Sequence, residues 1–234
     1  MSNVKNPDEL FKILKAEALG DAAFNHMLGF IQPGMTEIEC ADEIERFFLS
    51  HGAEGLSFPT IFISGKNTDQ MHGEPSEKRI EKGDFITIDI GCVLDGYCSD
   101  MTRTIAMGSV TPKMKEVYDI VLEAQLAGLA ALEVGARCFD VDKIVRDIIT
   151  EAGYGEYYIH GTGHGVGKKV HEEPYLNTKS RAILEENMAV TVEPGIYIPG
   201  EFGVRIEDLA ILTNFAIIDR KSTRLNSSHA LASR

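Results

Sequence analysis

The sequence predicts an α+β fold made of two similar halves, in which helices cover antiparallel strands. Segments 34–52 and 135–153 align with each other at one offset of 101 residues. In each half, a helical pattern is followed by a second helix and then by paired strands. Both strand pairs carry two acidic residues at corresponding places. A length of 234 residues allows one large domain or two small ones.

The first half is expected to begin with two helices. Asn6-Pro7 starts a run with acidic residues in its first turn, and Pro33-Gly34 ends this run. Glu17 interrupts the apolar face of this first helix. Thr36 is expected to cap a second helix that ends at Gly52. The expected strands lie near 59–63 and in a hairpin from 84 to 107.

The second half repeats this order. Thr111-Pro112 starts a third helix, and Gly135 ends the connection that follows it. A fourth helix is expected from about Phe139 to Gly153. The expected strands lie near 157–160, 188–198 and 203–213.

Asp95-Gly96 is a strong hairpin signal, because this dipeptide suits a two-residue turn. A turn centred there pairs Gly91 with Asp100. Side chains alternate along a strand, so Asp89 lies on the same face as Gly91 and Asp100. The carboxylates of Asp89 and Asp100 are therefore expected to be diagonal neighbours, with Cβ atoms about 7 Å apart or less.

The second hairpin is expected to turn at 200–202. This turn places Glu193 diagonally opposite Glu207, on the same face of the strands. The same register gives the pairs Gly195–Glu207 and Tyr197–Arg205. Each hairpin therefore brings two carboxylates together, and the duplication would make four acids face one another.

Four carboxylates in a half-buried sheet are costly unless protons or cations compensate them. A pair that shares a proton is one solution, but loops of the DTG or DSG type, which aspartic proteases use, are absent from the sequence. Solvated strand residues are another, but apolar residues flank Asp89 and Glu193. Two divalent ions fit four acids better, because bridging carboxylates neutralise dications.

Histidines support a metal site. The segment "HGTGHGVGKKVHEEP" holds His160, His164 and His171, and His72 lies in "MHGEP". Glycines on both sides of His164 let the backbone approach a ligand closely. One imidazole added to four carboxylates makes a plausible dinuclear site, whereas the HExxH motif of thermolysin-like zinc sites is absent from the sequence.

The charge and composition of the chain limit the classes of molecule that it is expected to bind. A net charge of −13 and a pI near 5.0 argue against nucleic acid or an anionic membrane, which would repel the chain. The sequence contains neither a membrane-spanning run nor an apolar signal segment at its start. The four cysteines lack CxxC spacing and are expected to be small buried residues of a reducing compartment. We expect a cytoplasmic protein.

Four segments, "DIGCVLDGYCSDMTRT", "GTGHGVGKKVHEEP", "VEPGIYIP" and "VRIED", resemble the pita-bread metallopeptidase family. This family contains methionine aminopeptidases, Xaa-Pro dipeptidases (prolidases) and Xaa-Pro aminopeptidases. The resemblance extends over about residues 5 to 213. It implies a duplicated pita-bread fold with two divalent metal ions between the halves. The implied metal ligands are Asp89, Asp100, His164, Glu193 and Glu207, of which Asp100 and Glu207 would bridge the ions.

Further residues near the metals are expected to contact the peptide. These are His72, His160, His171, Arg205 and Tyr197. For Tyr197, packing within the sheet is the alternative. The expected catalytic residues are Glu193, which would carry the proton, His171, which would stabilise the developing oxyanion, and His72, which would hold the peptide.

The segments "EPGIYIP" and "GVRIED" resemble the Xaa-Pro branch of the family. This resemblance implies hydrolysis of a short peptide with a free N-terminus and proline at the second position. A methionine aminopeptidase is the alternative enzyme, and a catalytically idle binding module is an alternative of another class. Manganese is the expected metal, while cobalt, iron and zinc fit the same ligands.

The catalytic domain is expected to span residues 1–213. Proline-directed members usually carry an additional N-terminal domain that helps to form a dimer, so a homodimer is possible but its basis here stays open. The remaining 214–234 would form a tail, disordered from about residue 219. Its segment "RKSTRLNSSH" resembles translated adapter sequence, with a genuine flexible tail as the alternative.

Overall fold

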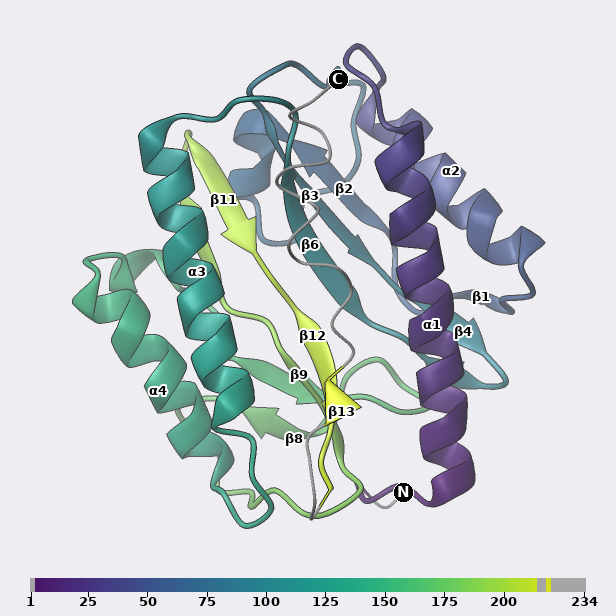
Figure 1. Cartoon of the computed structure of the whole chain (residues 1–234), viewed down its shortest axis with the longest axis vertical. Helices are drawn as coiled ribbons and strands as arrows, with labels where there is room; N and C mark the ends of the chain where they lie inside the picture. The colour runs from purple at the N-terminus through teal and green to yellow at the C-terminus, as the bar shows by residue number, and fades with distance from the viewer. Residues whose placement is uncertain (1–2, 214–217, 220–234) are drawn as a thin grey trace.

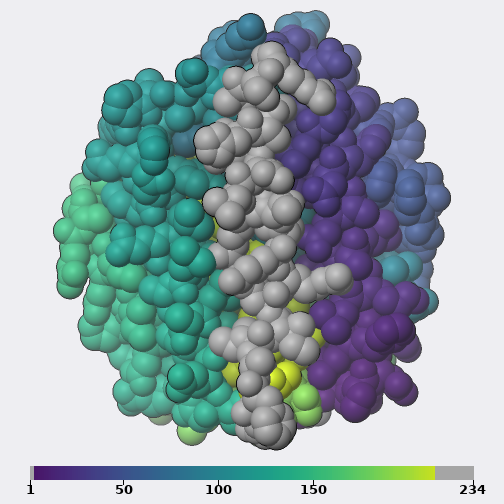
Figure 2. Space-filling view, viewed as in Figure 1, coloured from purple at the N-terminus to yellow at the C-terminus, as the bar shows by residue number. Residues whose placement is uncertain are grey.

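Two pairs of helices flank the strands of the molecule (Figure 1). Helices α1 (Pro7–Phe30) and α2 (Glu37–Ser50) belong to the first half, and α3 (Pro112–Ala130) and α4 (Cys138–Glu151) to the second. This computed structural model describes residues 3–213 and 218–219. All four helices lie where the sequence predicts them. In the space-filling view, the helices of the first half lie on the right of the visible face and those of the second half lie on the left (Figure 2).

The strands are short and form four sheets. Those of the first half are β1 (Gly55–Leu56), β2 (Ile61–Ser64), β3 (Phe85–Ile90), β4 (Cys92–Leu94), β5 (Tyr97–Cys98) and β6 (Met101–Ala106), with the 3₁₀ helix η1 (Gly65–Asp69). Those of the second half are β7 (Gly163–Gly165), β8 (Glu172–Leu176), β9 (Ala189–Val192), β10 (Gly195–Ile198), β11 (Phe202–Arg205), β12 (Asp208–Ile211) and β13 (Ile218–Asp219), with η2 (Gly155–Tyr157). The sheet orders are β1-β4-β5, β2-β3-β6, β10-β11 and β13-β12-β9-β7-β8.

Capping residues explain where three of the helices begin. The side chains of Asn6 and Thr36 each accept a hydrogen bond from a backbone N–H three residues on, at Glu9 and Glu39. Those glutamates bond back to the cap residue, which completes a capping box. Thr111 caps α3 through its side-chain oxygen. Local sequence therefore determines these helix starts.

The two halves repeat each other in detail. Helix α4 lies 101 residues after α2 at both ends. Thr36, which caps α2, forms an isolated β-bridge with Arg79, and Arg137, which precedes α4, forms one with Ile183. The predicted α+β architecture of two similar halves is confirmed.

The first hairpin has the predicted register. Asp89 of β3 pairs with Thr102 of β6, and β4 and β5 continue the same register toward the turn. Asp95 and Gly96 have φ values of 51° and 73°. Positive φ at both central residues is the backbone that Asp-Gly favours in a two-residue hairpin.

The register predicted for the second hairpin is wrong by two residues. Gly195 pairs with Arg205, not with Glu207, and Tyr197 pairs with Gly203, not with Arg205. The loop contains Gly200 at a φ of 75°, and this glycine lies at its centre. A shift of two residues leaves every side chain on its original face.

The shift changes how the acids of the second half meet. The β9–β12 ladder ends at the pair Val192–Asp208. The next residues, Glu193 and Glu207, therefore lie opposite each other instead of diagonally. Both still lie on one side of the strands, so the corrected register brings them closer together.

The strand expected at 157–160 is wrong, because β7 and β8 form further along the glycine-rich segment. A Cβ atom on Gly163 would lie 2.0 Å from the carbonyl oxygen of Thr191. One on Gly165 would lie 2.4 Å from that of Glu173. Glycine at these positions permits neighbouring backbones to approach closely.

The core of each half lies between its helices and its strands. Phe24 of α1, Phe48 of α2 and Ile88 of β3 are buried together in the first half. Val117 of α3 and Val145 of α4 are buried together in the second. Truncation of a buried phenylalanine typically costs about 3–5 kcal/mol. This packing fixes the strands that carry the acidic residues.

All four cysteines are buried and free of disulfides, as predicted. Within the part of the chain that the structure describes, no helix is long and apolar enough to cross a membrane. Of the predicted tail at 214–234, only Ile218–Asp219 is described, as β13 beside β12. The expectations for the rest of the tail fall outside the described residues.

Candidate metal centre

A cavity of about 500 Å³ is lined by residues from both halves. Its walls include the predicted metal ligands Asp89, Asp100, His164, Glu193 and Glu207. They also include His72, His160, His171 and Arg205. Of the predicted site residues, Tyr197 alone is not part of the wall, and it contacts two residues that are. The structure thus brings together residues that lie up to 135 positions apart in the sequence.

The acidic residues reach the cavity from strands or strand ends. Asp89 lies on β3, Asp100 directly before β6, Glu193 directly after β9 and Glu207 directly before β12. Asp89, Asp100 and Glu207 each place one carboxylate oxygen within 4.8 Å of the other two. Asp89 lies between the buried side chains of Ile88 and Ile90, which anchor this end of β3 in the core.

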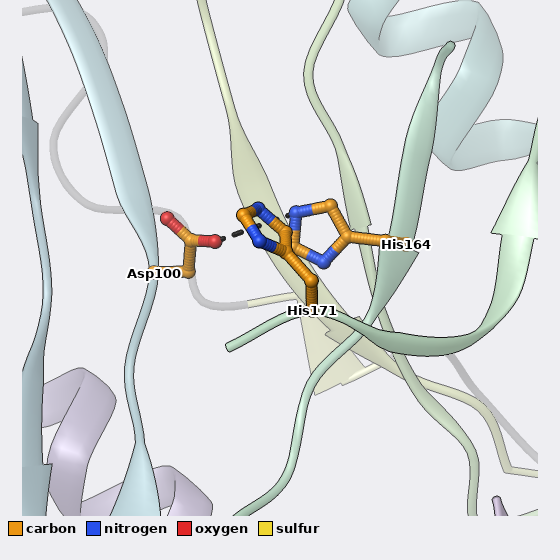
Figure 3. Close-up of side chains that lie close together, drawn as sticks. All are labelled: Asp100, His164 and His171. Atoms are coloured by element: carbon orange, nitrogen blue, oxygen red, sulfur yellow. Dashed lines mark ion pairs between the residues drawn. The ribbon is translucent and has the colours of Figure 1, made fainter. Parts of the chain in front are cut away.

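His164 joins the acids through its Nε2 atom. This nitrogen lies 3.2 Å from Oε1 of Glu193 and 3.5 Å from Oδ2 of Asp100. Its Nδ1 atom lies 3.1 Å from the carbonyl oxygen of Gly165, which can only accept. Nδ1 is therefore a donor, and Nε2 faces the carboxylates, where it donates when the ring is protonated and can bind a cation when the ring is neutral. The Asp100 carboxylate and the rings of His164 and His171 face one another in Figure 3.

Burial and mutual repulsion shift the carboxyl groups away from their ordinary acidity. The pKa of Asp100 is raised well above its usual range by burial and by the charges of Glu207 and Asp89. Burial, followed by the charge of Glu193, raises the pKa of Glu207 in the same way. Burial also raises the pKa of Asp89, against the opposing charge of Arg205. Without cations the cluster holds more negative charge than it can stabilise.

Glu193 and His164 stabilise each other's charged forms. Burial alone would raise the pKa of Glu193, but the hydrogen bond and charge of His164 lower it. Burial alone would lower the pKa of His164, but Glu193 raises it. This pair compensates one of the four acids and Arg205 compensates Asp89, which leaves Asp100 and Glu207.

The residues present fit divalent cations. Oδ1 of Asp89 and Oε1 of Glu207 are buried and make no hydrogen bond within the described part of the chain. An unsatisfied buried polar atom typically costs about 1–3 kcal/mol. A metal ion would satisfy both oxygens, and a donor set of four carboxylates and one imidazole suits manganese-like dications. His164, Glu193 and Glu207 form a second group of ligand atoms within 4.8 Å of one another.

Comparison with known proteins identifies the family. A sequence model of metallopeptidase family M24 matches residues 12–214. The chain belongs to metallopeptidase family M24. Solved structures that resemble this M24 chain include an Xaa-Pro dipeptidase from Bacillus anthracis, 49% identical with a TM-score of 0.91. The match covers 94% of this chain and 62% of that one. The predicted duplicated pita-bread fold is thereby confirmed.

Two further relatives have similar coverage. The prolidase from Pyrococcus furiosus is 42% identical with a TM-score of 0.90, over 92% of this M24 chain and 64% of that chain. An uncharacterised peptidase of Bacillus subtilis, YqhT, is 46% identical over 90% of this chain and 60% of its own length. The chain therefore spans roughly three fifths of the length of these relatives.

Arg205 links Asp89 of the cavity wall to Tyr197 behind it. Its Nη2 atom donates to Oδ2 of Asp89 over 2.6 Å, and its Nη1 atom donates to the hydroxyl of Tyr197 over 2.8 Å. The Tyr197 hydroxyl lies 3.0 Å from Nε2 of His160. Burial raises the pKa of Tyr197 to about 12, so the hydroxyl keeps its proton and donates it to His160. Tyr197 therefore hydrogen-bonds to Arg205, although the two residues are not paired in the sheet as predicted.

The remaining two histidines lie at the mouth of the cavity. His171 is exposed, and its ring centroid lies 4.3 Å from that of His164 at an interplanar angle of 77°. Burial and the charge of His164 lower the pKa of His171. His72 is also exposed on the cavity wall, in the loop 70–75 after η1. Both rings are accessible to a bound molecule.

Two residues of the site were not predicted. Thr102 donates to Oε2 of Glu207 over 2.8 Å, and Glu17 of α1 accepts from the backbone N–H of Asp100 over 2.9 Å. The correct register of the first hairpin pairs Thr102 with Asp89, so it could have been inferred. The signal for Glu17 was its interruption of an apolar helix face, and burial raises its pKa to about 8.

Proposed function

We propose that this chain is a dinuclear metal-dependent exopeptidase that removes the N-terminal residue from peptides with proline at the second position. The observation that carries the proposal is the convergence of four carboxylates and one imidazole on one cavity, with two buried carboxylate oxygens lacking partners. Similarity to solved structures described as an Xaa-Pro dipeptidase, a prolidase and an X-Pro aminopeptidase supports the choice of substrate.

Two of the three groups of ligand atoms, those that contain Glu207, suggest how the ions would be shared. Asp89, with Asp100 and Glu207, would hold one ion. His164 and Glu193, with Glu207 and Asp100, would hold the other, because Asp100 also lies within reach of His164. Asp100 and Glu207 would then bridge the pair. When bound, two divalent ions would lower the pKa of water so that hydroxide is available near neutral pH.

The side chains of the protein have separable roles in this reaction. Glu193, at the edge of the cluster and hydrogen-bonded to His164, would carry a proton from the attacking water to the leaving amine. His171 would donate a hydrogen bond to the developing oxyanion, and His72 would hold the peptide across the mouth of the cavity. Arg205 would fix Asp89 in the orientation that ligation needs.

The specificity for proline would depend on recognition of its ring. A proline after the scissile bond has no amide N–H, so recognition must come from its ring. Phe58, Ile61 and Tyr175 line the cavity and offer apolar surface to such a ring. Burial lowers the pKa of His160, and this ring, which is hydrogen-bonded to the Tyr197 hydroxyl, would contribute a further wall of the subsite.

The test uses protein stripped of metal by chelation and reconstituted separately with manganese, cobalt, iron or zinc. We expect about two ions per chain, hydrolysis of Ala-Pro and Ala-Pro-Ala peptides with manganese, and little hydrolysis of Met-Ala peptides. The variants Asp100→Ala and Glu207→Ala should lose the ions and the activity while remaining folded by circular dichroism. Asp119→Ala, at an exposed acid paired with Lys115 on α3, is the matched control.

Each alternative predicts a different result. Full turnover in either ligand variant would contradict a dinuclear site. A preference for Met-Ala peptides would identify a methionine aminopeptidase. A protein that takes up no metal on reconstitution and hydrolyses none of the peptides would identify a binding module. Comparison of Ala-Pro with longer peptides separates dipeptidase from aminopeptidase action.

A further inference from the structure

Glu37 is a fully buried carboxylate that lies outside the cavity. It occupies the first turn of α2, and its side chain accepts hydrogen bonds from three residues. The backbone N–H and hydroxyl of Ser64 lie 2.6 and 2.9 Å from Oε1. The backbone N–H and hydroxyl of Ser76 lie 3.1 and 2.6 Å from Oε2. The amide of Asn67 lies 3.2 Å from both oxygens.

These donors bracket the loop that carries His72. Ser64 and Asn67 lie before the loop 70–75, at the end of β2 and in η1, and Ser76 lies directly after it. The backbone of α2 adds two more bonds, since the N–H of Glu37 donates to the carbonyl of Lys78 and that of Ile38 to the carbonyl of Ser76. One carboxylate thus fixes both ends of the loop to one helix.

The second half of the molecule holds the same loop from the opposite side. Arg205 donates from Nη1 to the carbonyl oxygen of Met71 over 3.1 Å. The backbone N–H of Gly203 donates to the hydroxyl of Thr68 over 2.9 Å. His72 therefore projects from a segment that is fastened to both halves, while its own ring stays exposed on the cavity wall.

We propose that Glu37 is a positioning residue for the proposed peptidase reaction, holding the loop 70–75 so that His72 faces a bound peptide. The role depends on its negative charge, because every group around the carboxylate is a donor. A glutamine of the same shape would turn its NH₂ group toward donors and leave some of them unsatisfied. The loop 70–75 would then be held less tightly at one of its two ends, at Ser64 or at Ser76. The proposal rests on the proposed function, since it assigns the substrate contact to His72.

Asp142 is a buried acid of the second half that serves as a control. It is fully buried on α4 and accepts from the backbone N–H and hydroxyl of Thr162, over 3.2 and 2.9 Å. Thr162 lies between His160 and His164 in the sequence. A change at Asp142 therefore disturbs another loop of the same cavity, which provides a control for effects that do not pass through His72.

A double-mutant cycle tests the proposal. Glu37→Gln should lower kcat/KM for an Ala-Pro peptide by roughly 10-fold or more, because small displacements of contacting groups are costly. In the His72→Ala background the same change should cost less than about 2-fold, because the interaction through which it acts is already lost. Asp142→Asn should cost similar factors in both backgrounds. Glu45→Gln, at an exposed acid on α2, should change neither.

Hydrogen exchange provides a readout that does not need activity. Glu37→Gln should speed exchange in peptides covering 65–78 and leave those covering 158–166 unchanged, whereas Asp142→Asn should do the reverse. Ser76→Ala, a milder change, should show the first pattern to a lesser extent if Glu37→Gln fails to fold. Equal kinetic factors in the two His72 backgrounds, or unchanged exchange at 65–78, would overturn the role of Glu37. If the unsubstituted protein hydrolyses no Xaa-Pro peptide, the proposed function fails and exchange alone decides this inference.

Discussion

Arg205 and Asp89 form a buried ion pair that joins the two halves of the molecule inside the cavity, with 2.6 Å between Nη2 and Oδ2. The other guanidinium nitrogens are also occupied. Nε donates to the hydroxyl of Thr102, and Nη1 donates to Tyr197 and to the carbonyl oxygen of Met71. Arg205 occupies Oδ2 of Asp89, whereas Oδ1 has no hydrogen bond to any described residue and is available to a cation.

Arg205→Lys should therefore weaken metal binding and activity without removing the positive charge. A lysine ammonium cannot make the forked set of bonds that the guanidinium makes. Loss of a residue that orients a ligand typically costs about 10- to 100-fold in metal affinity or activity. Isothermal titration with manganese and kcat/KM for an Ala-Pro peptide measure the two effects. Lys113→Gln, which breaks an exposed pair with Glu201, should change neither; unchanged metal affinity in Arg205→Lys would show that the ion pair does not orient Asp89.

Tyr197→Phe isolates the contribution of one hydroxyl. This hydroxyl accepts from Arg205 and donates to Nε2 of His160, so its removal leaves both partners short of a bond. We expect a loss of roughly 10-fold in kcat/KM, since each broken bond is worth about 1 kcal/mol, with little change in metal content. Tyr154→Phe removes a tyrosine hydroxyl that pairs with Glu116 at the surface, and it should retain full activity. Equal activity in the two variants would mean that Tyr197 only packs in the sheet.

Local sequence was sufficient to predict those parts of the fold that depend only on residues close together in the chain. The Asp95-Gly96 turn fixes its own register because that dipeptide adopts the backbone that a two-residue turn requires. The glycines of β7 could not be interpreted in this way. Gly163 is required by the carbonyl of Thr191, which becomes a neighbour only in the folded chain. The sequence therefore indicated a strand at 157–160 and none at β7 or β8.

The same distinction applies to the site. Asp89 and Glu193 were conspicuous because each acid lies between apolar residues of its own segment. Glu37 was not, because an acid in the first turn of a helix is ordinary on the surface. Only its burial against Ser64 and Ser76 sets it apart. Long-range contacts are needed to identify residues that position others.

The reactivity of the four cysteine thiols is expected to differ between the folded and the unfolded chain at alkaline pH. Burial raises the pKa of Cys40 to about 12, and those of Cys92, Cys98 and Cys138 to about 11. At pH 9 the folded thiols therefore stay protonated, whereas unfolded thiols are largely ionised. A thiol-reactive disulfide reagent should label none of the four in the native protein and all four in guanidinium chloride.

The same shifts predict the direction of a stability change. Above pH 9 the unfolded chain loses thiol protons that the folded chain keeps, so the free energy of unfolding should fall as the pH rises toward 11. Denaturant titrations at pH 8 and pH 10 would measure this fall. Rapid native labelling at any of the four positions would show that its thiol is not held in the core.

Asp142→Ala should destabilise the second half far more than loss of an ordinary ion pair does. Asp142 binds the guanidinium of Arg146 over 3.0 Å and two groups of Thr162, and it is fully buried. Its removal leaves a partly buried cation and two donors uncompensated, a type of change that typically costs about 3–5 kcal/mol. Urea titration followed by circular dichroism measures the loss. Asp147→Ala, which breaks an exposed pair with Lys143 on the same helix, should not shift the midpoint. A similar midpoint for both variants would mean that Asp142 does not fix the segment between His160 and His164, and that this segment is held by the β7–β9 pairing instead.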